Sequence, residues 1–114
     1  DMFLVDTEGL IRKAMHSQHV ALGVISDSSF QTNLIELKMR AGERLIAYSD
    51  GVTDCSNHSG EMLGEAGFEM MFDGSVSGDE LFDSLVERIT TFGKGQPQDD
   101  DISIVDVAAA PFCA

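Results

Sequence analysis

Basic residues are scarce in this chain. Seven Lys and Arg stand against twenty Asp and Glu among 114 residues, giving a formal net charge of −13. A field of this sign repels nucleic acid backbones and anionic lipid surfaces. We therefore expect neither nucleic acid nor a membrane as a partner. The same field repels a phosphorylated substrate unless bound metal ions reverse the local charge.

The chain also lacks the marks of a membrane or disulfide-stabilised protein. No apolar run approaches the ~20 residues that a bilayer span needs, and no secretory signal pattern is present. Its two cysteines, Cys55 and Cys113, lie far apart and form no Cys-x-x-Cys or zinc motif. We expect a cytoplasmic location and buried or incidental thiols.

The order of apolar residues predicts several antiparallel strands. Residues 2–5 and 10–13 flank a turn and predict a hairpin. Alternating apolar and charged side chains predict a half-buried strand over residues 30–39. Residues 44–48 are almost continuously apolar, which predicts a central strand covered on both faces. Residues 102–107 predict a final strand.

Two helices are expected between these last strands. Helical spacing favours one over residues 61–72, although two glycines weaken it. The second has a predicted capping box of Ser77 and Glu80 and ends at Gly93. Its apolar stripe consists of Leu81, Phe82, Leu85, Val86, Ile89 and Phe92. The pattern predicts an α+β domain over residues 1–107, followed by a tail over residues 108–114.

Acidic residues stand at the ends of two predicted strands. Asp50-Gly51 follows the apolar run 44–48, and the cluster 99–101 precedes the final strand. Carboxylates held at strand ends can converge on a hard cation such as Mg²⁺ or Mn²⁺, which keeps several waters. Asp-Gly is also a common turn dipeptide, and Asp often caps helices. From the residues alone, a metal site and a set of turn residues both stay open.

Longer motifs around these acids point to a family. Residues 40–54, ending in Ser-Asp-Gly-Val-Thr-Asp, resemble the signature of bacterial metal-dependent phosphatases of the SpoIIE/RsbU type, in the phosphatase 2C-like superfamily. Residues 21–23 (Ala-Leu-Gly), 60–64 (Gly-Glu-Met-Leu-Gly) and 100–103 (Asp-Asp-Ile-Ser) resemble three further family motifs in the same order. The resemblance covers nearly the whole chain.

The resemblance implies a fold and a metal centre. The family has two stacked antiparallel sheets flanked by helices, a β-sandwich with two Mn²⁺ or Mg²⁺ ions at one edge. By position, Asp50 and Asp100 match its metal ligands, and Gly51 matches a sharp backbone turn beneath the ions. Asp101 stands beside a ligand, in a supporting role. Thr53, Asp54 and Ser103 match positions that orient these groups by hydrogen bonds.

The resemblance also implies an activity. The family hydrolyses phosphoserine or phosphothreonine with a metal-activated water, often in an anti-sigma-factor antagonist, under an upstream sensor or receiver domain. The family's N-terminal Asp ligand has no match before Asp50, so we expect a domain that is incomplete at its N-terminus and inactive by itself. The alternative is a truncated or degenerate domain that acts as a non-catalytic binding or sensor module. The sequence leaves open whether the protein forms a homodimer.

Other chemistries fit the residues poorly. A cysteine phosphatase needs an Arg six residues after its Cys, but Glu61 stands there after Cys55. A calcium loop starting at Asp50 would have Val52 at its third position, where an oxygen ligand is needed. The histidines His16, His19 and His58 lie in polar stretches and are expected at the surface.

Overall fold

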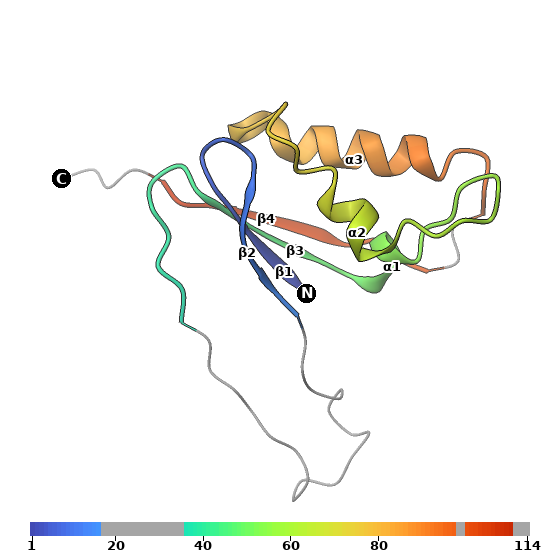
Figure 1. Cartoon of the computed structure of the whole chain (residues 1–114), viewed down its shortest axis with the longest axis horizontal. Coiled ribbons are helices and arrows are strands. Elements are labelled where there is room, and N and C mark those ends of the chain that lie inside the picture. The colour runs from blue at the N-terminus through green and yellow to red at the C-terminus, as the bar shows by residue number, and fades with distance from the viewer. Residues whose placement is uncertain (17–35, 98–99, 111–114) are drawn as a thin grey trace, which may run out of the picture.

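The computed structural model consists of one antiparallel sheet with helices along one of its faces (Figure 1). It describes residues 1–16, 36–97 and 100–110. The strands are β1 (Met2–Val5), β2 (Ile11–Met15), β3 (Arg44–Tyr48) and β4 (Ile104–Ala108), in the spatial order β2-β1-β3-β4. The predicted α+β class is confirmed.

The first two strands form the predicted hairpin. β1 pairs with β2 from Met2↔Met15 to Val5↔Ile11. The turn closes because the Asp6 carboxylate accepts the backbone N–H groups of Glu8 at 2.9 Å and Leu10 at 3.0 Å.

β3 occupies the centre of the sheet, as its apolar sequence predicts. It pairs with β1 on one side and with β4 on the other. The last strand starts two residues later than expected and runs to Ala108. Ala109 then exchanges backbone hydrogen bonds of 2.9 Å with Gly42 and Glu43. Ala108 of the expected 108–114 tail therefore belongs to β4, and Ala109 is hydrogen-bonded to the residues just before β3.

The expected strand over residues 30–39 is wrong in its described part. Residues 36–40 have no strand pairing, and residues 30–35 lie outside the described residues, as does the 21–23 motif. In Figure 1 the helices cover one face of the sheet only. On the other face Leu45 and Ala47 of β3 are half-buried, so the expected cover on both faces is not seen among the described residues. The second sheet of the expected sandwich is likewise not among them.

The helices differ from expectation in number and in bounds. A short helix, α1 (Asp50–Thr53), follows β3 directly and was not predicted. α2 spans Gly64–Glu69, not 61–72, because residues 55–63 fold back on themselves: Leu63 N–H donates to the Cys55 carbonyl at 2.7 Å and Asn57 N–H to that of Glu61 at 2.9 Å.

The last helix, α3 (Leu81–Phe92), is preceded by a 3₁₀ turn, Gly78–Glu80. Ser77 caps that turn without any side-chain hydrogen bond, so the predicted capping box is wrong. Gly93 ends α3 as predicted. Within the described residues, no helix combines the length and apolar character that a bilayer crossing requires.

The core lies between the sheet and the helices. Phe3 and Tyr48 of the sheet contact Phe68 of α2, with ring centroids 5.7 Å and 4.8 Å away. α3 buries Leu81, Leu85 and Ile89 against the same cluster, whereas Val86 of the predicted stripe is 42% exposed. These contacts fix α2 and the end of β3 against each other.

A buried acid stabilises the opposite end of β3. The Glu43 side chain is 2% exposed and accepts hydrogen bonds from the Arg40 backbone N–H at 2.7 Å and from Arg12 Nε at 2.8 Å. The Arg40 N–H and the Arg12 guanidinium hold the pKa of Glu43 below its ordinary value of 4.5, against the opposing effect of burial.

This lowered pKa predicts a loss of stability in acid. The unfolded chain binds a proton at Glu43 more readily than the folded chain, so the contribution is complete above about pH 4.5 and disappears as the pH falls through the folded pKa. Chemical denaturation between pH 7 and pH 3 should show a weaker pH dependence for Glu43→Gln than for wild type. Glu36→Gln, at an exposed position, is the control, and equal pH profiles for wild type and Glu43→Gln would contradict this assignment.

Candidate metal centre

The ends of β3 and β4 lie side by side at one edge of the sheet. Tyr48 pairs with Ile104 in the register of the two strands. Asp50 begins α1 just beyond β3, and Asp100 precedes β4 by four positions. Because the strands are antiparallel, the end of one meets the start of the other. Both acidic residues are exposed at this edge.

Ser49 fastens the two segments together. Its backbone N–H donates to the Ser103 carbonyl at 3.0 Å, and its Oγ donates to the Asp101 carbonyl at 3.2 Å. The same Oγ accepts the Ser103 N–H at 2.9 Å. Sequence reasoning missed Ser49. Its Oγ makes no N-cap hydrogen bond to α1 and contacts residues 52 and 54 positions away, so no local signal pointed to this role.

Gly51 is needed here because of close packing. It is buried, and a Cβ atom placed on it would overlap the carbonyl oxygen of Asp101. Its φ is not among the positive values found for other glycines, so the expected sharp turn is not the reason. The absent side chain is what lets α1 lie against the segment that contains Asp101.

The expected supporting residues act mainly through the backbone. Thr53 Oγ1 donates to the Asp50 carbonyl at 3.2 Å, not to its carboxylate. The Asp100 carboxylate accepts the Asp101 N–H at 2.8 Å. Asp101 and Ser103 contact Ser49 through main-chain atoms. The structure therefore joins the segments that carry Asp50 and Asp100, while metal ligation by their carboxylates stays a prediction.

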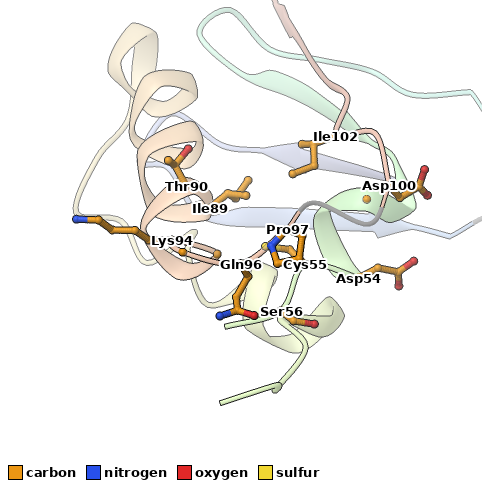
Figure 2. A pocket seen from close by; sticks show the side chains of 13 residues that line it. Asp54, Cys55, Ser56, Ile89, Thr90, Lys94, Gln96, Pro97, Asp100 and Ile102 are labelled. Carbon is orange, nitrogen blue, oxygen red and sulfur yellow. The ribbon is translucent and has the colours of Figure 1, made fainter. Parts of the chain in front are cut away.

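A cavity of about 380 Å³ opens beside this edge. Figure 2 shows Asp54 and Asp100 on one side of it and Lys94 on the other. Ile89 and Ile102 supply part of its apolar wall. The cavity can take a side chain or peptide segment next to a group bound at the acidic edge.

The donors at the edge fit a hard divalent cation. Mg²⁺ and Mn²⁺ prefer carboxylate oxygens and are bound through one or two carboxylates with several waters retained. In the part of the chain that the structure describes, neither Asp50 nor Asp100 belongs to a group of three converging His, Cys, Asp or Glu ligand atoms. The described residues thus fit a water-rich, open site rather than a closed one.

Burial disfavours the charged form of two further groups near the site. Burial, together with the negative charges of Glu65, Glu69 and Asp50, raises the pKa of Tyr48 to about 12. Burial also raises the pKa of the Cys55 thiol, which lines the cavity. Since the thiolate is the nucleophilic form, Cys55 is poorly suited to attack a phosphoryl group.

The packing of Gly51 predicts an unusual response to alanine. Gly51 and Gly67 both lie in short helices, where Ala is normally favoured over Gly by about 1 kcal/mol. Gly51→Ala should lower the free energy of unfolding by about 1–3 kcal/mol, because the new methyl group meets backbone. Gly67→Ala is the control: its methyl group meets only the flexible end of Leu63. Equal effects in urea denaturation would contradict the packing argument.

Comparisons with known proteins agree with this architecture. The chain is similar to the SiaA-PP2C domain of Pseudomonas aeruginosa, with a TM-score of 0.70 and 20% identity over 94% of this chain and 42% of that one. That likeness shows the fold. The chain is also 30% identical over 107 residues to Protein IcfG of Synechocystis sp., and spans 16% of that protein's length.

A family model covers almost the entire chain. The model of stage II sporulation protein E (SpoIIE) matches residues 1–109, which include both acidic strand ends and the segments that Ser49 and Gly51 hold together. The resemblance seen in the motifs is confirmed by this match. The chain belongs to the SpoIIE family and has the fold of a PP2C phosphatase domain.

Proposed function

We propose that this chain is the part of a phosphatase domain that carries Asp50 and Asp100, and that the complete domain hydrolyses phosphoserine or phosphothreonine in a cytoplasmic regulatory protein. The observation that carries the proposal is the fastening of the two acidic strand ends by Ser49 and Gly51. The SpoIIE family match supports phosphatase chemistry at this edge. An anti-sigma-factor antagonist is the class of substrate that we favour.

The residues of this edge have separate roles in the proposal. Asp50 and Asp100 would hold Mn²⁺ or Mg²⁺, and Ser49 and Gly51 keep the two carboxylates on adjoining segments. Bound divalent ions lower the pKa of water toward neutrality and neutralise charge on the phosphoryl group. The cavity beside Asp100 receives the peptide around the phosphorylated residue. No side-chain nucleophile is required, in keeping with the raised pKa of Cys55.

Charge-removing variants of the complete protein test this assignment. Asp50→Asn and Asp100→Asn should each lower kcat on a phosphoserine peptide by more than about a hundredfold, because loss of even an outer partner of a metal ligand costs tenfold to a hundredfold. Both residues are exposed, so circular dichroism should show an intact fold. Asp83→Asn on α3 is the charge-matched control. Near-normal kcat of either variant at saturating Mn²⁺ would rule out the site.

The second candidate is a non-catalytic binding or sensor module. It is favoured by the absence of a third converging ligand beside Asp50 and Asp100 among the described residues. The two candidates make different demands on the residues before Asp1. The enzyme requires a further Asp ligand there, following an upstream sensor or receiver domain. The module requires no such ligand.

Calorimetric titration with Mn²⁺ tests the ligand count directly. This chain alone should bind Mn²⁺ weakly, with a dissociation constant in the range of about 1 mM that few protein ligands allow. Adding the preceding segment should tighten binding at least about tenfold. Tight binding of two ions by this chain alone would show that its own residues complete the centre.

A further inference from the structure

Three side chains from separate elements meet at the same edge of the sheet, beside Tyr48. Asp1 precedes β1, His16 follows β2, and Glu65 lies in the first turn of α2. One ligand atom from each lies within 4.8 Å of the other two. In the described ranges, this is the one group of three His, Cys, Asp or Glu residues with such spacing. Sequence reasoning placed His16 at the surface without a role.

The two contacts that His16 makes with the carboxylates are longer than ordinary hydrogen bonds. His16 Nδ1 lies 3.5 Å from Asp1 Oδ2 and 3.7 Å from Glu65 Oε1. Hydrogen bonds from nitrogen to oxygen are ordinarily about 2.7–3.2 Å long. Ligands of a tetrahedral zinc ion, with bonds of about 2.0–2.1 Å, lie about 3.3 Å from each other. The two separations from His16 are therefore close to those of ligands that share an ion, and the third lies within 4.8 Å.

An unsatisfied hydroxyl lies beside this group. Tyr48 is 7% exposed, and its buried Oη has no hydrogen-bond partner in the described structure. The Tyr48 backbone N–H donates to the Asp1 carbonyl at 3.1 Å, which places the two residues next to each other. Of the carboxylates that raise the pKa of Tyr48, Glu65 has the largest effect. A water held at the group would give this hydroxyl the partner that it lacks.

We propose that Asp1, His16 and Glu65 form a binding site for a divalent transition metal of the zinc type, with Tyr48 hydrogen-bonded to a metal-bound water. The imidazole distinguishes this site from the all-carboxylate edge at Asp50 and Asp100, because His favours zinc-type ions over Mg²⁺. Three protein ligands leave a fourth position open. The ion would tie α2 to the ends of β1 and β2, close to the start of α1.

The test uses this chain with Asp50→Asn and Asp100→Asn in place, so that ions at the proposed phosphatase centre do not contribute. Titration with ZnCl₂ at pH 7 should give one bound ion per chain by calorimetry. The imidazole NMR signals of His16 should shift on saturation, and those of His58, in a separate exposed turn, should not. Failure of this titration leaves the Mn²⁺ chemistry at Asp50 and Asp100 unaffected.

Single variants then identify the ligands. His16→Ala and Glu65→Gln should each weaken Zn²⁺ binding at least about tenfold, while His58→Ala should leave it unchanged. Tyr48→Phe should weaken binding less than either. If His16→Ala fails to fold, Glu65→Gln and the His16 signals decide the matter. An absence of Zn²⁺ binding with unshifted His16 signals would overturn the site. Unchanged affinity in Glu65→Gln would also overturn it.

Discussion

The pairing of β3 with β4 is the constraint on which the acidic edge depends. The register runs from Arg44↔Ala108 to Tyr48↔Ile104, and it fixes which residues meet at each end. Because the strands are antiparallel, residues about fifty positions apart arrive at the same place. Ser49 and Gly51 extend this match beyond the last strand pair, the first by hydrogen bonds and the second by the absence of a side chain.

Local sequence patterns predicted those elements whose own residues determine them. The hairpin 2–15, the central strand β3 and the helix α3 follow from apolar periodicity and turn residues, and the structure has all three. The capping box failed because Ser77 begins a 3₁₀ turn before the helix proper. The start of α2 was misplaced because residues 55–63 pair with each other, and such backbone pairing is not readable from helical spacing.

The candidate site also combines residues that the local sequence reveals with residues that only the fold brings together. Asp50 and Gly51 stand out in the sequence because Asp-Gly follows an apolar strand, and the family motif adds Asp100. The role of Ser49 depends on partners 52 and 54 positions away, so no local pattern reveals it. The group of Asp1, His16 and Glu65 was hidden for the same reason: its members come from three elements, and only the folded sheet brings them together.

The distribution of charge links cation binding to substrate binding. Three arginines pair with acids other than Asp50 and Asp100: Arg12 with Glu43, Arg44 with Asp79 and Asp106, and Arg88 with Asp73. The edge itself carries acidic side chains in a chain of net charge −13, and repels a phosphate in the absence of cations. Lys94 lies across the cavity, and in the proposed function cations from solution add the rest of the positive charge that a phosphate needs there. By linkage, a phosphorylated ligand that binds more tightly to the cation-loaded edge must also tighten the binding of those cations.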